Sequence, residues 1–377
     1  GCVCDFTHII SSKGLSGFDD YPMPAEYPDF PSHRQLVAYF KGYADHFELR
    51  QHIQLNTRVA RAERGADERW RVHLSDTEQP EVFDSLVVCS GHHREPYIPS
   101  YPGRFTGEIM HSTAYRRADP FRDRRVLVVG AGNSACDIAA DISRVARTTC
   151  ISMRRGSYIA PKLMFGQPID QVVEFWRSYI PRFLLQPVFR LSLQLAIGRW
   201  QDYGLQQPKG GPLEMHPTLN SSILEALRSG QVQPRVGIER FDGERVEFCD
   251  RRVESFDAIL WATGFRFSFP FLPSSVVDWS PEQTPPLYLK MMHATIPNLF
   301  FIGLFQPIGC IWRSADYQAR IAAQQIAGRL QRPHDIAARI QRELSHPHWR
   351  FANSPRHTIE VDARFFRREL LRELAAA

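Results

Sequence analysis

The chain has 377 residues, too many for one ordinary hydrophobic core, so we expect two domains or one domain inserted into another. Hydrophobic residues make up 43% and charged residues 23%, which argues against a disordered or a membrane-spanning chain. The formal net charge is +5, and Lys and Arg are spread along the sequence. Composition therefore gives no indication of nucleic-acid binding.

Seven cysteines, mostly inside apolar runs, favour reduced thiols and a cytoplasmic protein. Cys2 and Cys4 form a CxC pair without a second pair or a histidine cluster nearby, so we expect no metal site. The sequence begins at Gly1 without a charged segment followed by an apolar one. We therefore expect no signal peptide, and we interpret the start as processed or incomplete.

The first third predicts a loop, a helix and several strands. Residues up to Ser32 are rich in Pro and aromatic side chains, which is typical of an ordered loop. Ser32 is a candidate N-cap for a helix that reaches about Phe47. Strands are predicted at Ile53–Val59, Trp70–Leu74 and Ser85–Cys89.

The centre predicts a strand, a glycine turn, a helix and a second strand. The apolar run 126–129 leads into the turn 130–135, a helical pattern covers 135–145, and 148–153 predicts the next strand. Residues 163–215 are dense in Phe, Trp, Leu and Pro and predict inserted helices. Their most apolar stretch, 183–197, is too short to span a bilayer, and we favour a buried helix over one on a membrane surface.

The last third predicts further strands and then helices. The strands are expected at Val232–Ile238, Arg245–Cys249, Ala258–Trp261 and Leu299–Gly303. A helix is expected from about Ser314 to Leu330, and the charged tail 333–377 is expected to be helical.

The glycine turn has the pattern GxGxxA after a buried strand and before a helix. Gly130 permits the tight turn, Gly132 permits close approach of a phosphate, and Ala135 permits close packing of helix and strand. With Asn133 and Ser134, the turn directs backbone N–H groups toward a pyrophosphate. The pattern predicts a dinucleotide site.

The second strand of this unit is followed by Arg154 and Arg155 rather than by a carboxylate. An acidic residue there binds the ribose hydroxyl of NAD, whereas arginine pairs with the 2′-phosphate of NADP. We therefore expect NADPH, and a solvated basic turn is the alternative interpretation.

Two predicted strands have the same sequence pattern. Each begins with an acidic residue, continues as an apolar run and ends with a hydroxyl residue and glycine. The first ends at Ser90-Gly91 and the second at Thr263-Gly264. Because two such elements flank one strand–helix–strand unit, paired dinucleotide-binding domains are favoured over a single Rossmann domain.

The sequence resembles the flavin-containing monooxygenases from about Ser11 to Leu330. The most specific piece matches the family fingerprint FxGxxxHxxxY with Phe105, Gly107, His111 and Tyr115. The glycine turn, the Ala262–Phe265 stretch, Gly303 and Gln306 are also similar to the family's sequence. For His111, a structural role in fixing the linker between domains is as compatible with the pattern as a catalytic one.

The resemblance implies an α/β fold with two Rossmann-like domains, the NADPH domain being inserted into the FAD domain. It assigns residues 1–118 and 265–377 to the FAD domain and 119–264 to the NADPH domain. It also implies that NADPH reduces FAD and that a C4a-hydroperoxyflavin formed with O2 oxygenates a small nucleophile at N or S. Catalytic side chains stay unassigned. A homo-oligomer and peripheral membrane contact are compatible with the sequence.

Two departures from the family leave alternatives open. No glycine-rich FAD unit precedes Phe6, and Ile10 stands where the family commonly has Asn near the flavin. A non-catalytic NADPH-binding relic of the fold is therefore one alternative. A Baeyer–Villiger monooxygenase acting on ketones is another, although those enzymes usually have Trp at the position of Tyr115.

Overall fold

The computed structural model describes residues 3–214, 217–280, 283–307, 309–347 and 358–376. Cys2 lies outside them. The chain forms two compact units, one of residues 1–12 and 96–265 and the other of residues 13–95 and 266–377. The chain thus passes from one unit to the other after residues 12, 95 and 265. The fold is α/β in both units.

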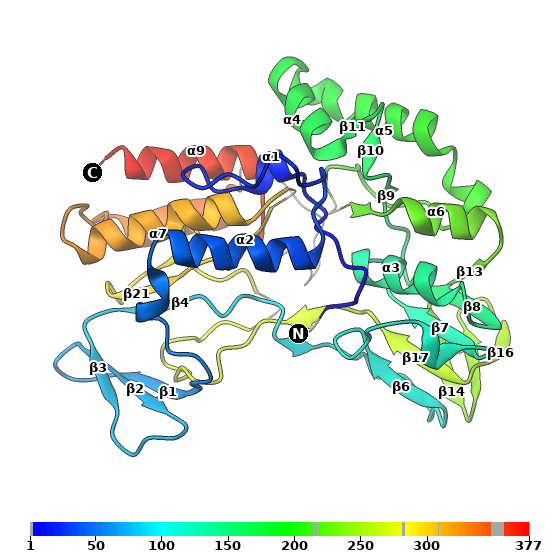
Figure 1. Cartoon of the computed structure of the whole chain (residues 1–377), viewed down its shortest axis with the longest axis horizontal. Helices are drawn as coiled ribbons and strands as arrows, with labels where there is room; N and C mark the ends of the chain where they lie inside the picture. Colours follow the sequence, from blue (N-terminus) through cyan, green and yellow to red (C-terminus); the bar gives the residue numbers. More distant parts are fainter. Residues whose placement is uncertain (1–2, 215–216, 281–282, 308, 348–357, 377) are drawn as a thin grey trace. The chain divides into compact units, whose positions relative to one another are not determined.

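The unit of residues 1–12 and 96–265 is built on a five-stranded parallel sheet (Figure 1). Helices α3 (Asn133–Ile142) and α6 (Ser221–Arg228) pack side by side along it. The strands in spatial order are β13 (Val232–Arg235), β8 (Thr148–Ser152), β7 (Arg125–Val129), β17 (Ala258–Trp261) and β6 (Glu108–His111). The predicted strand, glycine turn, helix and strand are confirmed as β7, α3 and β8.

A second, antiparallel sheet belongs to the same unit and packs on the parallel one. It consists of β14 (Ile238–Asp242), β15 (Arg245–Phe248) and β16 (Val253–Ser255). Leu127 and Val129 of β7 share a buried cluster with Phe248 of β15. Val126 and Val128 are also fully buried. A parallel strand covered on both faces requires this continuous apolar run.

The predicted helical insertion contains two helices, α4 (Ile169–Tyr179) and α5 (Arg182–Ile197). Along α5, Leu185, Phe189 and Leu193 recur every four residues and are buried. Other apolar side chains of α5 are exposed, so the favoured prediction of a buried helix holds for only one face of α5. Short elements frame the helices: β9 (Ile159–Ala160), β10 (Leu163–Met164), β11 (Gln167–Pro168), the 3-10 helix η3 (Trp200–Tyr203) and β12 (Thr218–Leu219).

The unit of residues 13–95 and 266–377 has a four-stranded sheet between an antiparallel sheet and helices (Figure 1). In β21 (Leu299–Phe301), Phe300 joins the cluster on the helix side, whereas Leu299 and Phe301 join the other cluster. The remaining elements are β19 (Leu287–Tyr288), β20 (Met292–His293), β4 (Leu86–Val88), β1 (Val59–Arg64), β2 (Trp70–Leu74), β3 (Glu81–Phe83), α7 (Trp312–Ile326), α8 (Ile336–Ser345) and α9 (Ala363–Leu374).

In the N-terminal part of this unit the predicted helix is confirmed and one predicted strand is wrong. Helix α2 (His33–His46) begins at the predicted N-cap Ser32, which forms a capping box with Gln35. A strand over Ile53–Val59 is wrong, because β1 starts at Val59 and Asn56 adopts a left-handed conformation (φ 56°) that breaks the extended run. Short elements complete the chain: α1 (Lys13–Ser16), η1 (Leu49–His52), β5 (Glu95–Pro96), η2 (Asp119–Phe121), β18 (Phe265–Arg266), β22 (Gln306–Pro307) and β23 (Glu360–Val361).

Candidate functional site

The glycine turn lies at the carboxyl end of β7, where open parallel sheets bind ligands. The N–H of Gly130 donates to the carbonyl of Ser152 at the end of β8 (3.0 Å). A Cβ on Gly130 would lie 2.3 Å from the carbonyl oxygen of Ala262 at the end of β17. Gly130 also has φ 141°, which glycine tolerates best. Three strand ends therefore meet at a position that only glycine fits.

Helix α3 begins directly after this turn. Its N-cap is Gly132, which has no side chain to cap the first backbone N–H groups. Ala135 is fully buried, whereas Ser134 is exposed and Asn133 is partly buried. The N–H groups at the start of α3, which no side chain caps, fit a phosphate because they also carry the positive end of the helix dipole.

Residues 218–220, which follow the helical insertion, form hydrogen bonds with the glycine turn and with α3. Asn133 Oδ1 accepts from the N–H of Leu219 (2.8 Å), and Thr218 Oγ1 donates to the carbonyl of Ala131 (2.7 Å). Asn220, the N-cap of α6, donates to Asp137 of α3 (2.6 Å). The Asn133 side chain is thus engaged within the protein.

Arg154 and Arg155 follow β8 by two and three residues, and both are exposed. No ion pair among the described residues involves either arginine. Burial of the neighbouring Tyr101 hydroxyl raises its pKa, while the charge of Arg154 lowers it. The two guanidinium groups are therefore available to an anionic ligand at the end of β8.

The fingerprint residues lie inside the unit that holds the glycine turn. Phe105 belongs to the buried cluster around Trp261, and a Cβ on Gly107 would lie 2.6 Å from the Phe105 ring. Tyr115 is 1% exposed, and its hydroxyl donates to Asp141 Oδ2 of α3 (2.6 Å). Burial raises the pKa of Tyr115, so this hydroxyl stays protonated.

His111 ends β6 and is buried. Its Nδ1 accepts from the N–H of Thr113 (3.3 Å), and its Nε2 lies 3.3 Å from the carbonyl oxygen of Gly264. One nitrogen accepting and the other donating describes a neutral imidazole. Burial lowers the pKa of His111, which favours that neutral form. The geometry favours a structural role for His111.

The carbonyl of Gly264 has a second donor, the N–H of Tyr97 (3.0 Å). Thr263 Oγ1 in turn donates to the carbonyl of Tyr97. Gly264 has φ 90°, in the left-handed region. Thr263, Gly264 and His111 therefore form one hydrogen-bonded junction. Tyr97 was missed by the sequence analysis, because its contribution is made through the backbone and leaves no side-chain pattern.

In the other unit, Gly91 and Gly303 follow the parallel neighbours β4 and β21. Both have positive φ (71° and 76°), and the space beside each α-carbon is open. Gln306 Oε1 lies 3.0 Å from His92 Nε2, which links the two turns. Ser90 is exposed at the same edge. The open space along this carboxyl edge fits the approach of a flat cofactor to the backbone.

The turn at Gly303, which follows β21, is held by a side chain of α7. Gln318 is fully buried, accepts from the N–H of Gly303 (2.9 Å) and donates to the carbonyl of Leu289 (2.8 Å). Strand β4 lies at the end of its sheet, and Val87 is 39% exposed. Strand β4 is therefore an edge strand of this sheet among the described residues.

No group of three or more His, Cys, Asp or Glu side chains among the described residues could hold a metal ion. No described helix is long and apolar enough to cross a membrane.

A family model described as "Flavin-binding monooxygenase-like" matches residues 5–376. The chain belongs to the flavin-containing monooxygenase family. This is a family of FAD- and NADPH-dependent oxidoreductases, and the resemblance found in the sequence is confirmed.

Two mammalian relatives illustrate the similarity. The chain is 34% identical over 358 residues to "Dimethylaniline monooxygenase [N-oxide-forming] 2" of Rattus norvegicus, covering 89% of this chain and 66% of that one. It is 33% identical over 374 residues to "Flavin-containing monooxygenase 5" of the same organism, covering 94% and 70%. The chain thus spans about two thirds of the length of these relatives.

Solved structures share the fold. S-allyl-L-cysteine S-oxygenase from Allium sativum superposes with a TM-score of 0.70 at 20% identity, covering 100% of this chain and 75% of that one. Cyclohexanone monooxygenase from Rhodococcus sp. Phi1, bound to NADP+, superposes with a TM-score of 0.74 at 14% identity, covering 98% and 89%. At these identities the likeness supports the α/β fold with two Rossmann-like domains and does not bear on the substrate.

We predict a pH dependence from His111. Because its folded pKa lies below its unfolded value of about 6.5, the unfolded chain takes up the proton first, and the free energy of unfolding should fall as pH drops below about 6.5. His111→Gln should flatten part of this dependence, and the difference from the parent isolates His111 from other histidines. Urea unfolding at several pH values measures it. A His111 NMR signal titrating above 6.5 would contradict the assignment.

Proposed function

We propose that the protein is an NADPH- and O2-dependent flavoprotein monooxygenase that oxygenates a soft nucleophile at N or S. The observation that carries the proposal is the uncapped start of α3 beside Gly130, at the carboxyl edge of a parallel sheet. Membership of a family of FAD- and NADPH-dependent enzymes supports it. Bound flavin, reduced by NADPH, supplies the activation of O2, and the protein supplies placement and exclusion of water.

We assign one dinucleotide to each unit. In the unit of residues 1–12 and 96–265, the N–H groups of 133–135 bind the NADPH pyrophosphate and Arg154 and Arg155 bind the 2′-phosphate. In the other unit, Ser90, Gly91, Gly303 and Gln306 line the edge that holds FAD. The fingerprint residues hold the NADPH unit in shape rather than touching the reacting atoms. Catalytic side chains are not part of the proposal.

The partners we propose are a small nucleophilic substrate and O2, without nucleic acid. None of the six described cysteines belongs to a disulfide, which supports a reducing, cytoplasmic location. A homo-oligomer stays a prediction.

The proposal is tested first by visible absorption of the purified protein. We expect a flavin spectrum that NADPH bleaches in air, together with oxygenated product from a tertiary amine or a sulfide. NADPH binding without flavin would instead support the relic alternative. A lactone or ester formed from a ketone, with no product from the amine or sulfide, would support a Baeyer–Villiger activity.

A substitution tests the coenzyme assignment. Arg154→Ala removes one charge-assisted partner of the 2′-phosphate, so we expect the NADPH Kd to rise about 10- to 100-fold and the NADH Kd to change less than about twofold. Arg147→Ala is the matched control, because Arg147 is exposed and directly precedes β8, at the amino end of this strand rather than at its carboxyl end. Calorimetry measures both constants, and equal losses for the two coenzymes would refute the assignment.

We also propose that the helical insertion contacts a membrane surface. Large apolar side chains on α4, α5 and the preceding hairpin are exposed, and Arg177 and Arg190 lie on the same helices. Exposed apolar patches of this kind serve protein or membrane contacts, and basic residues favour anionic lipid. The exposed set is Phe165, Phe175, Tyr179, Phe183, Leu191 and Leu195, with exposures of 57–78%.

Vesicle sedimentation tests the membrane proposal. We expect binding to vesicles that contain anionic phosphatidylserine and its loss in the double variant Phe183→Ser/Leu195→Ser. Val253→Ser is the matched control, because Val253 is an exposed apolar residue on β16, away from the insertion. If the parent stays in the supernatant but forms a dimer that the double variant lacks, a second copy of the chain covers this surface instead.

A further inference from the structure

Two buried polar side chains directly after the helical insertion contact the segment from which the glycine turn and α3 are built. Thr218 has no exposed surface, and Asn220 is 2% exposed. The Thr218 hydroxyl donates to the carbonyl of Ala131 (2.7 Å), and the Asn220 amide donates to Asp137 of α3 (2.6 Å). Because a buried hydrogen bond has a defined length and direction, these contacts fix where the turn lies.

The same residues are also bound to the segment that follows the arginine pair. Strand β12 pairs in parallel with β9, which comes shortly after that pair. The N–H of Thr218 donates to the carbonyl of Tyr158 (2.8 Å), and the N–H of Asn220 donates to the carbonyl of Ala160 (2.9 Å). Residues 218–220 therefore bridge the two parts of the proposed coenzyme site, the glycine turn and the arginine pair.

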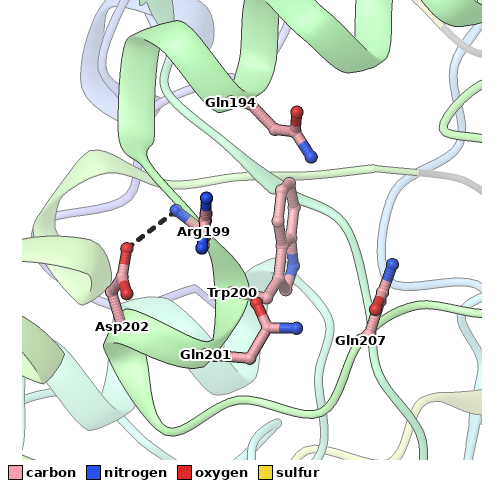
Figure 2. A pocket seen from close by; sticks show the side chains of 6 residues that line it. All are labelled: Gln194, Arg199, Trp200, Gln201, Asp202 and Gln207. Carbon is pink, nitrogen blue, oxygen red and sulfur yellow. Dashed lines mark hydrogen bonds between the residues drawn. The ribbon is translucent and has the colours of Figure 1, made fainter.

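The segment 156–160 is itself held by the chain that returns from α5. Trp200 of η3 donates from Nε1 to the carbonyl of Ser157 in a buried hydrogen bond (3.0 Å). Figure 2 shows Trp200 in the wall of a pocket of about 490 Å³. A Cβ on Gly156 would lie 2.4 Å from the carbonyl oxygen of Gln206, so the returning loop packs closely on this segment. Strand β12 thus has a fixed neighbour in β9.

We propose that Thr218 and Asn220 are positioning residues for the coenzyme. They fix the glycine turn relative to the arginine pair, so that one dinucleotide reaches both. A ligand that contacts two separate places binds tightly only where the protein already holds them at the matching distance, because otherwise binding must also order the protein. This inference rests on the proposed function. It gives two side chains outside the GxGxxA pattern a role in coenzyme binding without contact to the coenzyme.

Calorimetry with two ligands tests the positioning role. NADP+ spans both parts of the site, whereas adenosine 2′-monophosphate has a phosphate for the arginine pair and no pyrophosphate for the turn. Thr218→Val removes the hydroxyl and keeps the shape of the side chain. We expect it to weaken NADP+ about tenfold, because the Ala131 carbonyl loses its donor, and to leave adenosine 2′-monophosphate within about twofold. Thr218→Ser, which keeps the hydroxyl, should bind NADP+ within about threefold of the parent.

A second variant and a matched control complete the experiment. In Asn220→Ser a side-chain oxygen can still cap α6, but the amide that reaches Asp137 is removed, so we expect the same difference between the two ligands. Thr149→Val is the control, because Thr149 of β8 is 1% exposed and its hydroxyl has no hydrogen-bond partner among the residues that the structure describes. It should change neither affinity. Circular dichroism checks that each variant is folded.

Unchanged NADP+ affinity in both Thr218→Val and Asn220→Ser would overturn the inference. Equal weakening of the two ligands would overturn it as well, because a general loosening of the fold has that effect. Arg154→Ala separates this failure from failure of the proposed function. If Arg154→Ala weakens both ligands while the two positioning variants bind NADP+ like the parent, the coenzyme site stands and only the positioning role is wrong. If the parent binds neither ligand, both proposals fail together.

Discussion

The absence of a side chain at position 130 is the constraint on which the proposed coenzyme site depends. Gly130 lies where β7, β8 and β17 end, hydrogen-bonded to Ser152 and so close to the carbonyl of Ala262 that a Cβ would lie 2.3 Å from it. This close approach lets the chain turn sharply into α3, whose first N–H groups have no capping side chain. The same strand ends carry Arg154 beyond β8 and Gly264 beyond β17.

The fingerprint residues contact the segment after β17 and helix α3, which adjoin this turn. His111 and Tyr97 both bind the carbonyl of Gly264, and Tyr115 binds Asp141 near the end of α3. The contacts of His111 and Tyr115 thus join β6 and the segment after it to elements of the proposed coenzyme site. The described contacts of His111 and Tyr115 are all within the protein, which supports a structural role for the fingerprint.

The sequence predicted those parts of the fold that local chemistry determines. The apolar run of β7, the glycine turn and the arginines after β8 are adjacent in the sequence, so their spacing predicts both the strand–helix–strand unit and NADPH. The strand expected at 53–59 was wrong because Asn56 takes a left-handed conformation, which asparagine tolerates without requiring it.

Contacts between distant residues could not be predicted in this way. His111 meets Gly264 across 153 positions, and Tyr97 contributes through its backbone alone. The pocket at Trp200 depends on a loop packed against Gly156, which no periodicity reveals. The resemblance to the family supplied the candidate residues, and the structure was needed to find what each one contacts.

The central claim is that the glycine turn holds the coenzyme while the fingerprint only supports it. Backbone amide NMR of the protein with and without NADPH tests this claim directly. The account predicts large shifts and slowed hydrogen exchange at Asn133, Ser134 and Ala135, with little change at Thr113 and Tyr115. Changes confined to the fingerprint amides, with none at the start of α3, would contradict it.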